Sequence, residues 1–95
     1  HGDDIYLELP LFFTQAILGE TIQVPALKGS LESKLKAGTR DKQQYVFRGE
    51  GVESLQGYGK GDLIVQIKLI YPEKLTNEQK ELLIKLQESF GIESK

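Results

Sequence analysis

Hydrophobic and polar residues alternate along several stretches of the chain, a pattern typical of half-buried β-strands. In residues 4–11 the odd positions from Ile5 to Leu11 are apolar, whereas Tyr6 and Glu8 lie on the other face. The same period recurs further along, so that about five strands are expected, over 4–11, 20–27, 30–36, 43–48 and 62–71. Lys28 and Gly29 would form the turn of a hairpin between the second and third strands.

Two prolines and one apolar strand refine this picture. Pro10 and Pro25 lack the backbone N–H that a central strand needs, so both predict sheet edges or bulges. In residues 62–71 the second face carries Ile64 and Ile70, which favours a central strand covered on both sides.

Two helices are expected. In residues 12–18 the apolar spacing changes to that of a short helix, with Thr14 as N-cap and Gly19 just past the end. Thr76 and Gln79 form a capping-box pattern, which predicts a terminal helix over residues 76–90. The chain is therefore expected to be a single mainly-β domain over residues 1–95. It would be a small β-sandwich of about five strands, complete by about residue 71, with one short helix and an amphipathic C-terminal helix.

The terminal helix has an apolar stripe at helical spacing, and one further isoleucine, Ile84, points well away from it. The stripe consists of Leu75, Leu82, Leu83, Leu86 and Phe90. Two interpretations are open. The stripe packs on the domain's own sheet, which the pattern alone favours, or it packs against another molecule.

Composition narrows the classes of function. The net charge is −2 with acids and bases interspersed, which argues against nucleic acid as a partner. No apolar run approaches the roughly 20 residues that span a bilayer, and no signal peptide is recognisable. Cysteine is absent, which excludes a disulfide or thiolate metal site. Because methionine is also absent and the first residue is His1, the chain is expected to come from a longer protein.

No catalytic constellation is found. His1 is the only histidine and stands at a chain end, so it cannot form a dyad or a metal cluster alone. Residues 49–61 contain five glycines and invite a phosphate-binding interpretation. They lack the Gly-Lys-Ser/Thr ending of a P-loop and lead into a strand instead of a helix, so a strand-to-strand loop is favoured. We expect a protein that is not an enzyme.

Several short motifs follow one another in a specific order. They are Gly2–Leu7, Ala16–Gly29, Ala37–Thr39, Arg48–Val52 and Gly61–Val65, followed by Pro72 and Leu75-Thr76. In order and spacing they resemble the second C-terminal β-domain of DnaJ-type co-chaperones. The similarity runs from Gly2 to about Leu86, with Glu50 and Ala26 in place of the family's usual lysine and threonine.

The resemblance implies a cytoplasmic chaperone module that forms a homodimer through its C-terminal helix. It also implies help in holding unfolded client polypeptides for a DnaK-type chaperone. The family's His-Pro-Asp motif and zinc region are absent from this sequence, so no cofactor is expected. The alternative is a structural spacer that dimerises but has no client contact of its own.

Candidate site residues follow from the resemblance and the pattern together. The dimer interface would comprise Leu82, Leu83, Ile84, Leu86 and Phe90. Clients could add as a strand at a proline-marked edge, with Phe12, Phe13, Ile22 and Val24 as candidates. A role as core residues is an equally good interpretation of Ile22 and Val24.

A rough energy estimate limits what the helix can do alone. If five apolar side chains are each half exposed, burying the remainder contributes ~4–8 kcal/mol. Association costs ~4–15 kcal/mol. We therefore expect further surface to join the dimer interface, or the dimer to be weak.

Overall fold

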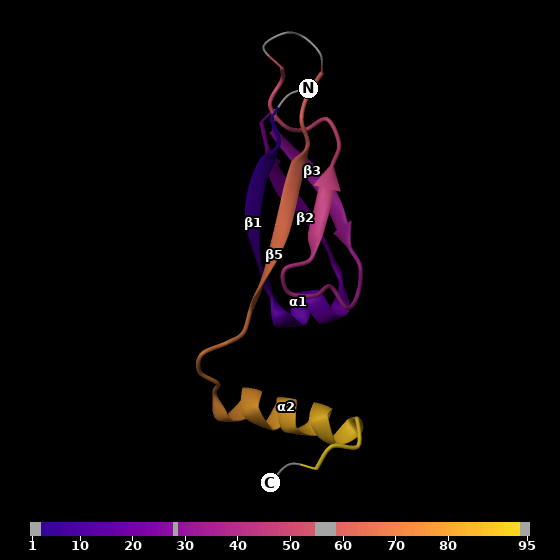
Figure 1. Cartoon of the computed structure of the whole chain (residues 1–95). Coiled ribbons are helices and arrows are strands. Elements are labelled where there is room, and N and C mark those ends of the chain that lie inside the picture. Colours follow the sequence, from indigo (N-terminus) through magenta and orange to yellow (C-terminus); the bar gives the residue numbers. More distant parts are fainter. Residues whose placement is uncertain (1–2, 28, 55–58, 94–95) are drawn as a thin grey trace.

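The computed structural model describes residues 3–27, 29–54 and 59–93 and has a mainly-β fold, as predicted (Figure 1). Its elements in chain order are β1 (Ile5–Phe12), α1 (Phe13–Leu18), β2 (Glu20–Ala26), β3 (Gly29–Leu35), β4 (Gln44–Phe47), β5 (Leu63–Ile70) and α2 (Asn77–Ser89). The predicted strands and helices are all present, and none of their ends is shifted by more than one residue.

In the part of the chain that the structure describes, five strands form two sheets. In the three-stranded sheet, β5 lies between β1 and β4, pairing parallel with β1 and antiparallel with β4. The second sheet is the antiparallel hairpin of β2 and β3. The sequence pattern did not predict that the first and last strands pair in parallel, with most of the domain forming the crossover between them.

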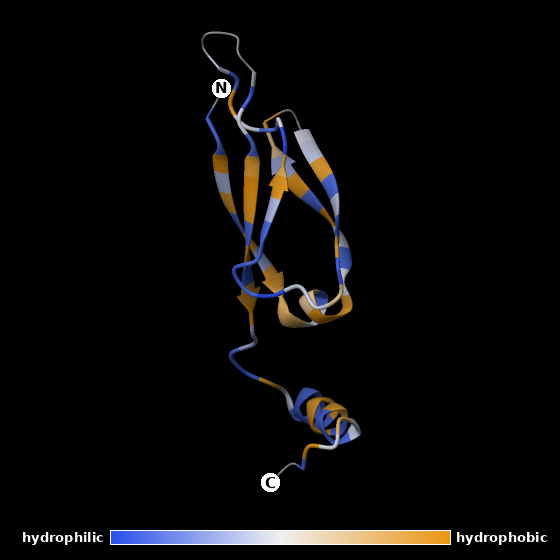
Figure 2. Ribbon diagram, turned by 45° about the vertical axis from the view of Figure 1, so that its right-hand side comes forward, coloured by the Kyte–Doolittle hydropathy of each residue, from blue (hydrophilic) through white to orange (hydrophobic). Residues whose placement is uncertain are grey.

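The core lies between the two sheets and follows the period-two pattern. Leu63, Val65 and Ile67 of β5 point inward and are each at most 2% exposed. They pack with Val24 of β2 and Leu35 of β3, which belong to the same two apolar clusters. Figure 2 shows the alternation of hydrophobic and hydrophilic residues along the strands. Burial of these side chains is the main stabilising contribution of the fold.

The two prolines lie where they were expected. Pro10 is in β1, an edge strand of the three-stranded sheet, and Pro25 is in β2, whose only partner among the described strands is β3. The missing N–H groups therefore interrupt no central ladder.

Three local expectations were wrong. Thr14 is not the N-cap of α1: the cap is Phe12, whose backbone N–H donates to Gln15 Oε1 at 3.0 Å. Gly29 is not a turn residue, because it pairs with Ala26 as the first residue of β3. Lys28, the other expected turn residue, lies outside the described residues. Finally, β5 is central but covered on one face only, since Lys68 on its outer face is exposed and Ile64 is half-buried.

One of the sequence motifs closes the lower end of the sandwich. The backbone N–H groups of Gly38 and Thr39 both donate to the carbonyl of Ala16, at 2.9 and 3.0 Å, and so satisfy the end of α1. The buried Thr39 hydroxyl donates to the Lys36 carbonyl at 2.7 Å and lies 3.0 Å from the Tyr45 hydroxyl. The Ala37–Thr39 motif therefore joins α1 to the sheets.

Candidate functional site: the terminal helix and its pocket

Helix α2 stands apart from the sandwich at the end of an extended linker (Figure 1). None of its described residues is buried, and it packs extensively against no other element. The molecule is consequently elongated, with extents of 62 × 23 × 18 Å. The interpretation that the apolar stripe packs on the domain's own sheet is therefore wrong.

The helix begins where the capping pattern predicted. The Thr76 hydroxyl accepts from the Gln79 backbone N–H at 3.1 Å, and the Gln79 side chain accepts from the Thr76 N–H at 2.8 Å. These reciprocal bonds satisfy N–H groups that a helix start otherwise leaves without partners. Since a helix of this length is marginal in water by itself, the cap favours its formation before any partner is bound.

The predicted dimer residues divide into two groups. Phe90 is 75% exposed, Leu82 59% and Leu86 51%. Leu83 and Ile84 are half-buried. The three exposed residues lie on one side of the helix by their spacing. Together they form an apolar face that the rest of the described chain leaves open.

A pocket of about 300 Å³ lies where α2 meets the end of the sandwich. Sequence analysis did not predict it, because its two walls come from opposite ends of the chain. Its lining is largely apolar and consists of Phe12, Phe13, Thr14, Pro72, Lys74, Leu75, Gln79, Leu82 and Leu83.

Aromatic contacts brace the sandwich side of this pocket. The rings of Phe13 and Tyr71 are stacked, with centroids 5.7 Å apart and planes at 25°. The rings of Phe12 and Phe13 lie 4.9 Å apart at 59°. Because Tyr71 directly precedes the linker to α2, this stacking fixes the point from which the helix departs.

The four candidate client residues are not brought together. Phe12 is 39% exposed and Phe13 half-buried, and both line the α2 pocket. Val24 is 1% exposed in the core, and Ile22 is half-buried against both core clusters. The positions of Ile22 and Val24 fit their alternative interpretation as core residues. A client-binding role stays a prediction for all four.

A second, smaller cavity lies between β1 and β2, an edge strand of each sheet. It measures about 140 Å³, and its few polar groups include Glu50. It is lined by Ile5, Leu7, Pro25, Ala26, Leu27, Glu50 and Leu63, so that β1 and β2 face each other across it. Both strands have a free edge among the described residues.

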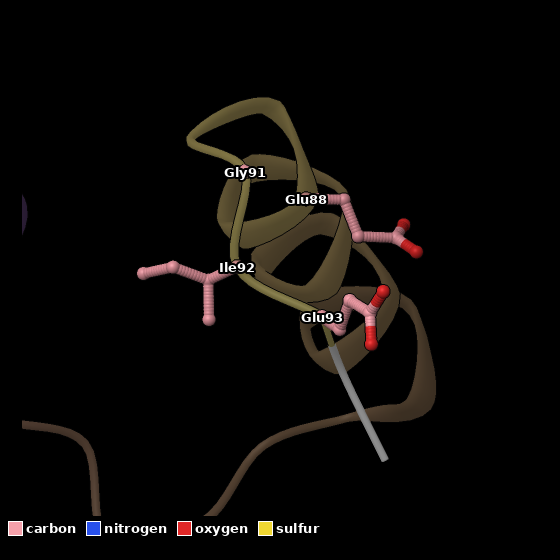
Figure 3. A pocket seen from close by; sticks show the side chains of 4 residues that line it. All are labelled: Glu88, Gly91, Ile92 and Glu93. Carbon is pink, nitrogen blue, oxygen red and sulfur yellow. The ribbon is translucent and has the colours of Figure 1, made fainter.

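A third hollow, at the end of α2, is lined by Glu88, Gly91, Ile92 and Glu93. The Gly91 N–H donates to the Glu88 carbonyl at 2.9 Å, and the chain turns back at Gly91 with φ of 83°. In Figure 3 the side chain of Ile92 points away from the carboxylates of Glu88 and Glu93. This open hollow is a consequence of the helix ending and offers no ligand site.

Within the described ranges, no group of three or more histidine, cysteine, aspartate or glutamate residues could hold a metal ion. Over the same ranges, no helix is long and apolar enough to cross a membrane.

Comparison with known proteins agrees with the resemblance seen in the sequence. Residues 1–72 match the family model of the DnaJ C-terminal domain. The chain belongs to this DnaJ C-terminal domain family. It is 67% identical over all 95 residues to the chaperone protein DnaJ of Aliarcobacter butzleri, covering 26% of that protein. Identity is 59% to the DnaJ of Nitratiruptor sp., again over the whole chain and 26% of the relative. It is 52% to that of Wolinella succinogenes, over 98% of this chain and 25% of the relative.

Two features of these matches bear on the site. The chain spans about a quarter of the length of these DnaJ relatives and corresponds to their C-terminal part. The family model ends at residue 72, in the linker before α2, whereas the alignments with the DnaJ relatives continue through the residues of the helix. The terminal helix is therefore shared with these close DnaJ relatives.

Proposed function

We propose that this chain is the dimerisation and auxiliary client-binding module of a DnaJ-type co-chaperone. In this proposal it acts in the cytoplasm, has no enzymatic activity, and helps to hold unfolded polypeptides for delivery to a DnaK-type chaperone. Neither nucleic acid nor a membrane is a partner. Membership of the DnaJ family supports this proposal. The observation that carries its dimerisation part is the open apolar face of α2.

The exposed fractions of the helix residues allow the dimer energy to be estimated. Full burial of a large apolar side chain contributes ~1.5–3 kcal/mol. Scaled by the exposure of Leu82, Leu86 and Phe90, the remaining burial contributes roughly 3–6 kcal/mol for one helix. A two-fold dimer uses the same face of both copies, so the total is ~6–11 kcal/mol.

This total lies within the association cost of ~4–15 kcal/mol. The α2 face by itself therefore supports at most a weak dimer, as expected from the sequence. The α2 pocket offers the additional surface, because Phe12 and Leu75 expose 39% and 43% of their area beside the helix. We propose that the partner's helix covers this pocket as well as the α2 face.

In this proposal, client binding rests on the free edges of β1 and β2. An extended peptide can add to a free edge through backbone hydrogen bonds, which do not depend on the peptide's sequence. The cavity between β1 and β2 lies beside both edges and is mainly apolar. It offers a place for one client side chain, next to Leu27, which is 65% exposed. We propose this cavity, in addition to Phe12 and Phe13, as the client contact.

Two measurements test the parts of the proposal separately. Sedimentation over a concentration range tests dimerisation, and a monomer at high micromolar concentration would contradict it. Titration with an unfolded apolar peptide, followed by amide chemical shifts, tests client binding. Shifts along Glu20–Leu27 are expected, whereas no shift at millimolar peptide would favour the structural spacer.

A further inference from the structure

The outer face of the three-stranded sheet carries an apolar row across all its strands. Tyr6 of β1 and Val46 of β4 both pair in register with Ile64 of β5. Neighbouring strands of a sheet lie ~4.7–4.9 Å apart, so the three side chains on this face are neighbours. Tyr6 is 72% exposed, Val46 48%, and Ile64 is half-buried. We call these three residues the apolar row.

The next positions on the same face are polar. Glu8, Gln66 and Gln44 form the adjacent row, in which the Gln44 side chain donates to Gln66 Oε1 at 3.5 Å. Beyond it, Lys68 lies 3.9 Å from the Glu8 carboxylate. The middle of the outer face is therefore polar and faces solvent. The apolar row at its end is a separate patch and not part of a larger apolar surface.

The chain enters the domain beside this row at a fixed point. The Val52 N–H donates to the Asp3 carbonyl at 2.8 Å, and the Asp62 N–H donates to the Asp4 carboxylate at 2.7 Å. Gly61 packs so closely on the Asp3 backbone that a Cβ would collide with it. A Cβ on Gly51 would lie 2.6 Å from the Asp3 carbonyl oxygen. The glycine-rich segment that looked like a phosphate loop thus holds residues 3 and 4 in place.

We infer that the apolar row docks an apolar surface of the protein segment that precedes this domain in the full-length protein. Asp3 is three residues from Tyr6, so chain preceding Asp3 starts within ~10 Å of the row. In the DnaJ relatives the matched segment is the C-terminal quarter, with most of the protein before it. The row is near the start of β1 and β5 and the end of β4, and this end of the sandwich is the one with the N-terminus, away from α2 (Figure 1).

The size of the row favours an intramolecular partner. Three side chains expose much less area than the ~800 Å² per partner of a stable interface between separate molecules. A covalently attached partner is present at an effective concentration of about millimolar, at which a small contact suffices. The row therefore fits a neighbour in the same chain better than a second copy or a free client.

The test compares the 95-residue chain with the full-length protein. Methyl resonances of Val46 and Ile64 are recorded in both, over a range of protein concentrations. The inference expects both methyl groups to shift in the full-length protein, independently of concentration. Identical resonances in the two chains would overturn it. Shifts that grow with protein concentration would also overturn the inference, because they indicate contact with a second copy. Shifts that appear only when an unfolded peptide is added would overturn it as well.

A pair of variants provides an independent readout. In the full-length protein, Tyr6→Ser with Val46→Ser is expected to speed proteolytic cleavage just before Asp3 by about tenfold, a factor equivalent to ~1.4 kcal/mol. The matched control is Glu8→Ser with Gln44→Ser, one row further along the same two strands, and should leave the cleavage rate unchanged. Equal rates for both pairs, with thermal unfolding of the domain unaltered, would contradict the inference.

Discussion

Replacing Phe90 by alanine is predicted to weaken self-association strongly while leaving the fold intact. The side chain is 75% exposed in the single chain, so a dimer that covers it gains ~1–2 kcal/mol per copy. Both copies lose this contribution in a two-fold dimer, which amounts to ~2–4.5 kcal/mol. The dissociation constant should therefore rise roughly 30- to 2,000-fold.

The fold itself should be insensitive to this change. Substitutions of exposed residues usually alter the free energy of unfolding by no more than ~0.5 kcal/mol. Phe90 is the C-cap of α2, outside the sandwich core. Thermal unfolding of the β-strands should consequently match that of the unchanged chain when both are monomeric.

Sedimentation equilibrium of the two chains over the same concentration range measures the effect. Glu81→Ala is a suitable control, because Glu81 is exposed on the same helix but lies away from the apolar face. The reasoning is refuted if Phe90→Ala and Glu81→Ala have the same dissociation constant. It is also refuted if the unchanged chain stays monomeric at high micromolar concentration.

Three further substitutions test the fold beneath the site. Thr76→Ala removes the side-chain half of the α2 cap and should lower the stability of the helix by ~1 kcal/mol. Amide exchange should become faster in α2 and stay unchanged in β5. Equal loss of protection in both elements would show that the helix is coupled to the sandwich. Ile67→Ala opens a cavity in the core and should lower the free energy of unfolding by ~2–5 kcal/mol in urea, and a loss below ~1 kcal/mol would contradict the core assignment. Gly61→Ala places a Cβ against the Asp3 backbone and should destabilise the domain in the same urea assay, whereas unchanged stability would show that residues 3 and 4 are not held there.

The local sequence pattern predicted the strands and helices well, because the residues of each element themselves indicate its type and its buried face. The alternation in residues 62–71 reports which side chains of β5 face the core, and Leu63 and Val65 are indeed buried. The Thr76 and Gln79 pair encodes both hydrogen bonds of its own cap, so the start of α2 followed directly from two side chains.

Long-range pairing was not predictable in the same way. The parallel alignment of Ile5 with Leu63 joins residues from opposite ends of the chain, and no local period specifies such a partner. The cap of α1 was missed for a different reason: Thr14 has the preferred residue type, but the Gln15 side chain reaches the Phe12 N–H and sets the helix start. Competing side chains within one turn cannot be ranked from type alone.

The sequence predicted the apolar face of α2 but not what surrounds it. Helical spacing identified Leu82, Leu86 and Phe90 as one face. Spacing cannot tell whether that face meets the domain's own sheet, because the answer depends on where the linker after Tyr71 leads. The pocket beside α2 could not be predicted for the same reason. Phe12 and Leu82 line it together only because the tertiary fold brings them to the same place.

Contacts between two copies test the central claim most directly. In a sample mixed from isotope-labelled and unlabelled chains, nuclear Overhauser effects can be filtered for those that cross between molecules. The account predicts cross-molecule effects from the Phe90 ring to the methyl groups of Leu82 and Leu86. A dimer whose only cross-molecule effects involve strand residues such as Val46 would contradict it.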